Sequence, residues 1–138
     1  MENIVENNKL LAEFLNFEKV KFPDAYYVFV IPDYLTHNDY KNLTLEDDKE
    51  VVAWCAEHLL FHKDWNWLMQ VVDEIESLGF ATDLCSTTTN DNQVFSIWTS
   101  GEGAGKQVIT LKESKFFKFE AVYNACVEFV KWYIEQNK

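Results

Sequence analysis

Cys55, His58 and His62 form the one set of side chains whose types and spacing could hold a metal ion. In a helix they would lie at positions i, i+3 and i+7 on one face, where a thiolate and two imidazoles are suitable ligands for Zn²⁺. The same stretch carries Trp54 and Leu59, so the histidines also fit the edge of an apolar core. Because clusters of this kind are often structural, we expect no metal and no cofactor.

The segment SGEGAGK, residues 100–106, has the glycine content of a phosphate-binding loop but not its pattern. That pattern requires glycine at position 100, where serine stands, and serine or threonine at 107, where glutamine stands. The segment also joins two predicted strands, whereas a phosphate loop opens a helix. We expect a hairpin tip here. The sequence also lacks a local signature of a nucleophile paired with a base. We therefore expect no enzyme and no catalytic residues.

The charge of the chain is its most informative global property. It contains 23 acidic and 12 basic residues, for a net charge of −11, and every basic residue is a lysine. Phosphate recognition relies heavily on the bidentate guanidinium of arginine, which this sequence lacks. An acidic surface also repels a phosphate backbone. We therefore expect no direct contact with nucleic acid. The charge either serves solubility alone or attracts a basic protein partner.

Composition predicts a cytoplasmic protein of one domain. A chain of 138 residues, 48% of them hydrophobic, can bury a substantial core. No apolar run reaches the roughly 18 residues that cross a bilayer, and the polar start lacks the pattern of a signal peptide. Cys55, Cys85 and Cys126 are odd in number and widely spaced, unlike a disulfide framework. We expect a single domain, residues 1–138, in the cytoplasm, without membrane contact.

Hydrophobic periodicity predicts the elements of the fold. The predicted helices span 7–16, 45–61, 64–78 and 116–136, and the predicted strands span 25–31, 80–87, 93–100 and 107–112. Asn7 or Asn8 would cap the first helix, Thr44 the second and Asp64 the third, which Gly79 would end. The last three strands are too close together for crossover helices. The fold class is therefore α+β: an antiparallel β-meander of three or more strands, packed against two or more helices including a long apolar C-terminal helix.

The apolar faces of the last two predicted helices define the expected core. Trp65 and Trp67 are separated by about 200° around a helix, so one of them must leave the main apolar face, and we assign Trp65 to that face. The expected core residues are Trp65, Leu68, Val72, Ile75, Val122, Cys126, Val130 and Tyr133. The polar stripe of the C-terminal helix is thin, so this helix either crosses the sheet or completes its burial in a dimer.

A turn-rich, acidic segment with several tyrosines is the candidate for partner binding. Tyrosine and tryptophan commonly anchor binding surfaces, and carboxylates select a basic partner. The predicted partner-binding residues are Asp33, Tyr34, Asp39, Tyr40, Glu46, Asp47, Asp48 and Glu50. They fall between segments of the chain that resemble those of a known family.

Three segments carry that resemblance: NNKLLAEFLNF (7–17), HKDWNWLMQVVDEIESLGF (62–80) and FFKFEAVYNACVEFVKWY (116–133). They resemble a family of small proteins of bacteriophages and their bacterial hosts. The match covers about a third of the chain, and its most distinctive stretches are DWNWLM and EAVYNACVEFVKWY. The segments 24–61 and 81–115 lie outside it. The family offers no catalytic motif to transfer to this sequence.

The resemblance implies a phage or mobile-element setting, in which small acidic proteins without active sites often inhibit host defence. It implies a non-enzymatic inhibitor of the anti-CRISPR type, which acts on an RNA-guided nuclease by protein–protein binding. Two alternatives remain open. An immunity protein or antitoxin that neutralises a basic nuclease toxin would need the same charge complementarity. A small metal-dependent enzyme built around Cys55, His58 and His62 would instead retain a metal on purification.

Overall fold

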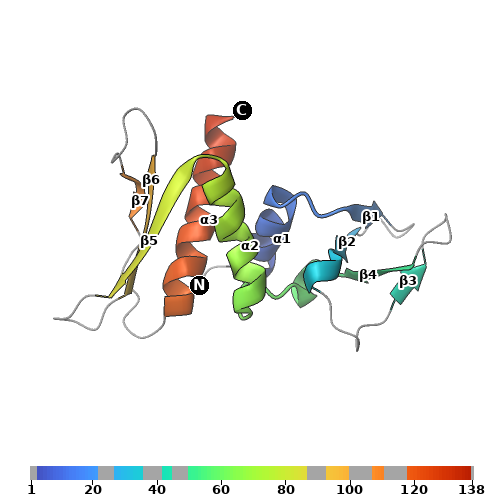
Figure 1. The fold of residues 1–138 in the computed structure, drawn as a ribbon. Coiled ribbons are helices and arrows are strands. Elements are labelled where there is room, and N and C mark those ends of the chain that lie inside the picture. The colour runs from blue at the N-terminus through green and yellow to red at the C-terminus, as the bar shows by residue number, and fades with distance from the viewer. Residues whose placement is uncertain are drawn as a thin grey trace. The chain divides into compact units, whose positions relative to one another are not determined.

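The computed structural model describes residues 3–21, 27–35, 42–44, 50–86, 93–99, 107–110 and 118–137 of the 138-residue chain. The chain is organised into two compact units, Met1–Leu60 and Phe61–Lys138, which we call unit 1 and unit 2 (Figure 1). Both units combine helices with antiparallel strands. The predicted α+β class is thereby confirmed, and the number of domains stays a prediction.

Unit 1 contains a four-stranded antiparallel sheet, an α-helix and two short 3-10 helices among its described residues. Its elements are α1 (Ile4–Phe14), β1 (Lys19–Lys21), β2 (Tyr27–Ile31), η1 (Asp33–Leu35), β3 (Asn42–Thr44), β4 (Glu50–Trp54) and η2 (Ala56–His58). The strand order is β1-β2-β4-β3. Strand β2 ends where predicted, before Pro32, which has no N–H for a ladder. The buried apolar side chains are Leu11, Ala12, Phe17, Val28, Phe29, Ile31, Leu35 and Leu59.

Helix α1 begins earlier than predicted because Asn3 is its cap. The side-chain oxygen of Asn3 accepts a hydrogen bond from the backbone N–H of Glu6 at 3.2 Å. Asn7 and Asn8, which were predicted as caps, lie inside the helix and are buried, so that prediction is wrong. The side-chain amide of Asn8 donates instead to the carbonyl oxygen of Leu59 at 3.1 Å.

The end of α1 is a left-handed turn at Asn16, whose φ is 60°. Asn16 donates its backbone N–H to the carbonyl of Glu13, and Phe17 donates to the carbonyl of Ala12, each at 3.0 Å. This is the Schellman motif, in which a residue with positive φ allows two orphaned helix carbonyls to be satisfied. Phe17 is buried after the turn, as the motif favours, and the chain then enters β1.

The predicted helix over 45–61 is wrong. The chain instead forms β4, paired with β2 and β3, and then η2. Thr44, predicted as a helix cap, is the last residue of β3 and pairs with Glu50. The sequence VVAW at 51–54 is rich in β-branched and aromatic residues, which favour a strand once partner strands are present. Residues 45–49 lie outside the described part of the chain.

Unit 2 packs two helices on a three-stranded meander. Its described elements are α2 (Trp65–Ser77), β5 (Phe80–Ser86), β6 (Gln93–Thr99), β7 (Gln107–Thr110) and α3 (Lys118–Gln136). The antiparallel strand order is β5-β6-β7. Helix α3 packs against β6 and β7, and α2 packs against β5 and α3. The two helices run side by side and begin at the same end of the unit (Figure 1). The predicted meander and both of its helices are confirmed.

The residues at both ends of α2 act as predicted. Asp64 caps the helix, since its carboxylate oxygen accepts hydrogen bonds from the backbone N–H groups of Asn66 at 2.8 Å and Trp67 at 3.4 Å. Gly79 follows the helix with a φ of 99° and donates its N–H to the carbonyl of Glu76 at 3.0 Å. Glycine adopts this φ without the strain that a side chain would add, so the chain turns directly into β5.

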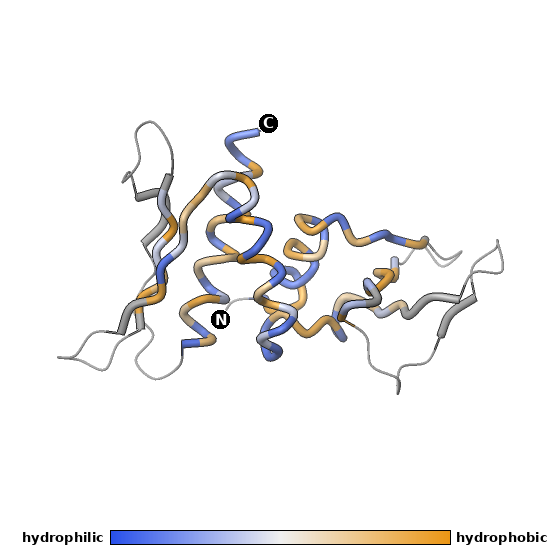
Figure 2. The backbone as a smooth tube through the Cα atoms, in the orientation of Figure 1, coloured by the Kyte–Doolittle hydropathy of each residue, from blue (hydrophilic) through white to orange (hydrophobic). Residues whose placement is uncertain are grey.

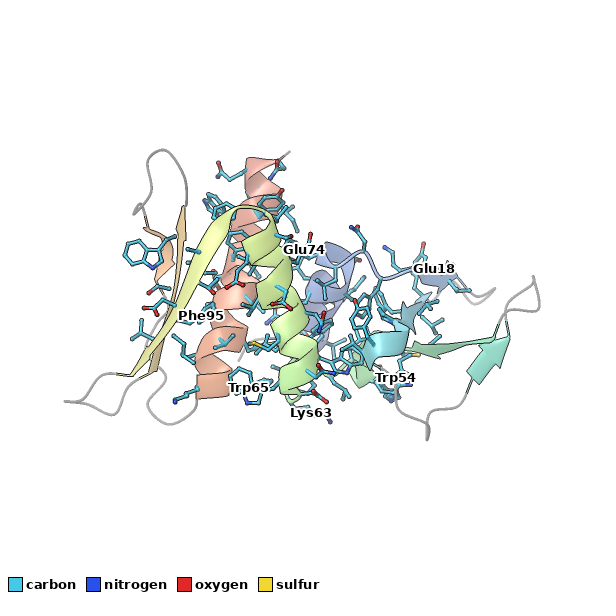
Figure 3. All side chains as sticks on the ribbon, viewed as in Figure 1. Glu18, Trp54, Lys63, Trp65, Glu74 and Phe95 are labelled. Carbon is cyan, nitrogen blue, oxygen red and sulfur yellow. The ribbon has the colours of Figure 1, made fainter. Side chains whose placement is uncertain are left out.

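The core of unit 2 lies between the sheet and α3. Along β6, Phe95 and Ile97 are buried, whereas Ser96 and Trp98 alternate to the other face and are half-buried. Phe95 lies between the sheet and α3 (Figure 3). Helix α3 buries Ala121, Val122, Tyr123, Ala125, Cys126, Val127, Phe129 and Val130. Its last turn mixes hydrophilic residues with Ile134 (Figure 2), and no described residue after Val130 is buried. Burial is therefore concentrated in the earlier turns.

The expected core is largely correct, with one exchange. The expected residues that are buried are Leu68, Val72, Ile75, Val122, Cys126 and Val130. Trp65 is 43% exposed while Trp67 is 1% exposed, so the assignment of Trp65 to the core is wrong. Both rings flank the apolar face of α2, and neighbours decide between them: Phe61 packs edge-on against Trp67 with 5.1 Å between ring centroids. Tyr133 is half-buried.

Candidate binding surfaces

Tyr34 is the predicted binding residue that the structure describes most fully. It lies on η1, two residues after Pro32, and is 62% exposed. The next residue, Leu35, is buried and donates its N–H to the carbonyl of Pro32 at 2.9 Å. A buried leucine and a closed turn thus fix the backbone that presents the exposed ring. Rigidly presented aromatic side chains are typical anchors of protein interfaces.

The other predicted binding residues are placed only in part. Asp33 begins η1 beside Tyr34, and Glu50 begins β4, the strand that pairs with β2. The side chains of Asp33 and Glu50 are outside the described part of the chain. Five further predicted residues, Asp39, Tyr40, Glu46, Asp47 and Asp48, also lie outside it. The described residues therefore bring Asp33 and Tyr34 together on one turn.

A second exposed tyrosine in unit 1 already holds a cation. The Lys19 ammonium lies 5.6 Å from the centroid of the Tyr27 ring and 3.4 Å from a carboxylate oxygen of Glu13. Tyr27 is 45% exposed. This is a cation–π contact supported by a carboxylate. Sequence reasoning missed it, because the turn at Asn16 is what brings the end of α1 next to β1 and β2.

The candidate metal ligands do not share a helical face. Cys55 precedes η2, His58 ends it, and His62 lies in the turn that follows. Since a short 3-10 helix replaces the predicted α-helix, the expected i, i+3, i+7 geometry is lost. Within the described part of the chain, no group of three or more His, Cys, Asp or Glu side chains is placed to hold a metal ion.

Among the described residues, two titratable side chains have displaced pKa values. Burial, reinforced by the positive charge of Lys63, lowers the pKa of His62 from 6.5. Burial raises the pKa of the Cys126 thiol, which lies in the core on α3. A protonated, inaccessible thiol is a poor nucleophile, so Cys126 acts as a core residue.

The glycine-rich segment 100–106 lies outside the described residues, but the elements on either side of it are clear. Strand β6 ends at Thr99, and Gln107 begins β7, its antiparallel neighbour. The segment therefore leads into a strand, as predicted. A phosphate loop would need a helix at this point.

Aromatic rings gather where α2 and α3 end in unit 2. Phe129 is fully buried, and its ring centroid lies 4.9 Å from that of Phe80, 5.7 Å from that of Trp132 and 5.8 Å from that of Tyr133. Phe80 also meets Trp132 edge-on, with 6.0 Å between centroids. The three outer rings are half-buried. We call Phe80, Phe129, Trp132 and Tyr133 the aromatic cluster.

Two exposed apolar side chains lie close to the aromatic cluster in sequence. Leu78 is 38% exposed and lies two residues before Phe80, and Ile134 is 40% exposed and lies two residues after Trp132. Sequence reasoning assigned Tyr133 to the core and did not find this cluster. The helical spacing of 129, 132 and 133 was visible, but only the fold brings Phe80 to them.

Carboxylates flank Trp132 along α3. Glu128 and Glu135 are exposed and lie at i−4 and i+3 from Trp132, which places both on its side of the helix. Lys131 is exposed between them and offsets one of the two charges. Both α2 and α3 finish here without a basic residue in the last turn, so their negative dipole ends add to the acidic potential.

The opposite end of the same two helices has a different character. Trp65 lies at the start of α2 (Figure 3). It packs edge-on against Phe119 at the start of α3, with 4.8 Å between ring centroids. Lys63 and Lys118 are exposed there, and Asp64 is engaged in capping. The start of the helix pair therefore combines two lysines with Asp64 and Glu120, whereas two glutamates and one lysine surround Trp132 near the other end.

No family model, curated protein or solved structure matches this chain. The resemblance to phage and bacterial proteins accordingly stays a prediction. Among the described residues, no helix is long and apolar enough to cross a membrane.

Proposed function

We propose that this chain is a non-enzymatic binding protein that inhibits a basic nucleic-acid enzyme of a host defence system, an RNA-guided nuclease of the CRISPR class. The observation that carries the proposal is Tyr34, a 62% exposed ring on a hydrogen-bonded turn in a chain of net charge −11. An exposed aromatic residue within an acidic field is suited to a cationic protein surface.

The physical basis is competition with phosphate. The nucleic-acid groove of a nuclease is lined by cations, and its positive potential draws in a polyanion. A protein with 23 carboxylates and 12 ammonium groups is attracted by the same potential. Charge complementarity mainly accelerates association, so inhibition is expected to weaken as salt rises.

The direct test adds the purified protein to purified RNA-guided nucleases before their target DNA and measures cleavage over a series of salt concentrations. We expect cleavage by the bound nuclease to fall, Tyr34→Ala to relieve the inhibition, and Tyr34→Phe, which keeps the ring, to retain most of it. If all these nucleases cleave normally and a basic nuclease toxin is neutralised instead, the immunity-protein alternative replaces this proposal. Normal activity of both kinds of enzyme rejects an inhibitor function.

Charge reversal locates the surface. Changing Asp47, Asp48 and Glu50 together to lysine is expected to slow association with the inhibited nuclease about tenfold or more at low salt, because electrostatic steering is lost. The matched control changes Glu18, Glu57 and Asp73 to lysine: these are exposed, lie outside the predicted surface and alter the net charge equally. Equal rates for the two triple variants would show that the acidic field acts as a whole, without a local site.

A further inference from the structure

We propose that the aromatic cluster of unit 2 is a second docking surface, which takes an arginine side chain of a protein partner against Trp132, between Glu128 and Glu135. This surface is separate from the turn that carries Tyr34. The proposal rests on the proposed function only for the class of partner, a cationic protein.

The aromatic cluster has the anatomy of a preorganised binding platform. Phe129 is fully buried and contacts each of the three outer rings, so Phe80, Trp132 and Tyr133 stand on a fixed base while remaining half-exposed. Rings that are already ordered lose little conformational entropy when a partner arrives. Interface hot spots are typically aromatic residues of this kind.

Charge selects a cationic occupant. Glu128 and Glu135 flank Trp132, and α2 and α3 direct their negative dipole ends to this end of the unit. Lys131 offsets one carboxylate, so these three described side chains together keep one negative charge in excess. A cation over an indole is attracted by the ring quadrupole, and carboxylates on either side add charge-assisted hydrogen bonds.

Arginine satisfies both contacts better than lysine does. Its planar guanidinium stacks on an aromatic ring while its N–H groups reach carboxylates at the edge, whereas an ammonium is a strongly hydrated point charge. The sequence contains no arginine, so a second copy of the chain cannot supply this group. A second copy would also bring another net charge of −11 to an acidic surface. The occupant is therefore a different protein.

Unit 1 contains the same chemistry in an intramolecular form. Lys19 lies against the ring of Tyr27 with Glu13 beside it. Trp132 has two flanking carboxylates where Tyr27 has one, and tryptophan is the stronger cation–π partner. In unit 2, Lys131 lies next to these carboxylates in sequence.

The test titrates the isotopically labelled full chain with a capped hexa-arginine peptide and follows backbone amide shifts and the dissociation constant. We expect shifts centred on 78–80 and 128–136. Trp132→Ala is expected to weaken binding about tenfold, whereas Trp65→Ala, at the opposite end of the helix pair, leaves it unchanged. A capped hexa-lysine peptide is expected to bind several-fold more weakly than hexa-arginine.

Surface charges provide a second set of variants, which does not disturb packing. Glu135→Gln is expected to weaken peptide binding, whereas Glu120→Gln, which removes one exposed charge from the other end of α3, has a clearly smaller effect. Lys131→Gln is expected to strengthen binding, because it removes the competing cation. These signs follow from a site at Trp132 and not from net charge alone.

Three outcomes would overturn the inference. Equal loss in Trp65→Ala and Trp132→Ala would show non-specific attraction, and equal affinity for hexa-lysine would remove the assignment to arginine. Shifts confined to 27–35, with sensitivity to Tyr34→Ala, would move the binding to unit 1 and leave the proposed function intact. Conversely, peptide binding at Trp132 without inhibition of any nuclease would reject the proposed function while supporting this surface.

Discussion

The two units bury their helices in different ways. In unit 1 the buried face of α1 includes Asn7 and Asn8 beside Leu11 and Ala12. In unit 2 the buried part of α3 consists of aliphatic and aromatic residues and Cys126, and its aromatic packing centres on Phe129. A hydrogen bond fixes a helix in one direction and register, whereas apolar packing supplies more free energy with less directional control. Unit 1 thus depends on a specific hydrogen bond, whereas unit 2 depends on apolar side chains that fill its core.

The sharpest test of this contrast is Phe129→Ala. Removing the buried ring on which the aromatic cluster stands is expected to cost about 3–5 kcal/mol of unfolding free energy. Urea unfolding measures the loss. Phe119→Ala is the matched control, because that ring is half-buried at the other end of α3, and it is expected to cost about 1–2 kcal/mol. Equal losses would mean that the aromatic cluster is not organised around Phe129.

A smaller effect is expected from Asn8→Ala in unit 1. This change leaves the buried carbonyl of Leu59 without the amide that reaches it at 3.1 Å. An unsatisfied buried acceptor costs about 1–3 kcal/mol. Asn66→Ala on the exposed side of α2 provides the comparison and is expected to stay within about 0.5 kcal/mol of wild type. If Asn8→Ala leaves the unfolding free energy unchanged, unit 1 does not depend on this hydrogen bond. The contrast with unit 2 would then fail.

The smallest expected effect concerns pH. The pKa of His62 is lowered below 6.5 in the folded protein by burial and by Lys63, so the unfolded chain binds more protons in the window just below 6.5. The contribution of His62 to stability is therefore present above 6.5 and is lost as pH falls towards the folded pKa. His62→Gln is expected to flatten slightly the fall in stability between about pH 7 and 5. An unchanged slope in His62→Gln would contradict the assignment.

Unit 2 was largely predictable because its signals are local. Asp64 and Gly79 bound α2 as cap and terminator, and the short spacing after Gly79 requires a meander. What local pattern could not decide was which of Trp65 and Trp67 is buried. Both flank the apolar face, and the contact of Phe61 with Trp67 comes from tertiary packing.

Unit 1 was poorly predictable because its information is not local. Asparagine is a common helix cap, so Asn7 and Asn8 were assigned that role, although the actual cap is Asn3. Acidic residues after Thr44 are equally typical of a helix start, but β4 pairs with strands on both sides. Pairing partners outweigh intrinsic preference in a sheet. The sequence does not show which strands lie next to one another in the folded sheet.

The candidate surfaces show the same difference between local and non-local information. Sequence composition directed attention to the acidic tyrosine-containing segment, and Tyr34 is indeed exposed there. The aromatic cluster was missed because Phe80 joins residues of α3 that are distant in sequence. Side chains that recur at helical spacing are read as core by default, although Trp132 and Tyr133 are both half-exposed.

The parallel arrangement of α2 and α3 also affects how unit 2 folds while it is being synthesised. Parallel neighbours cannot be joined by a short hairpin, and here the whole meander of β5, β6 and β7 separates them in the chain. The contacts that close the core therefore join residues far apart in sequence, which slows folding. On the ribosome, Phe95 and Ile97 emerge well before the helix that covers them. Until α3 has left the exit tunnel, the nascent meander exposes its apolar face and is open to chaperones or to premature association.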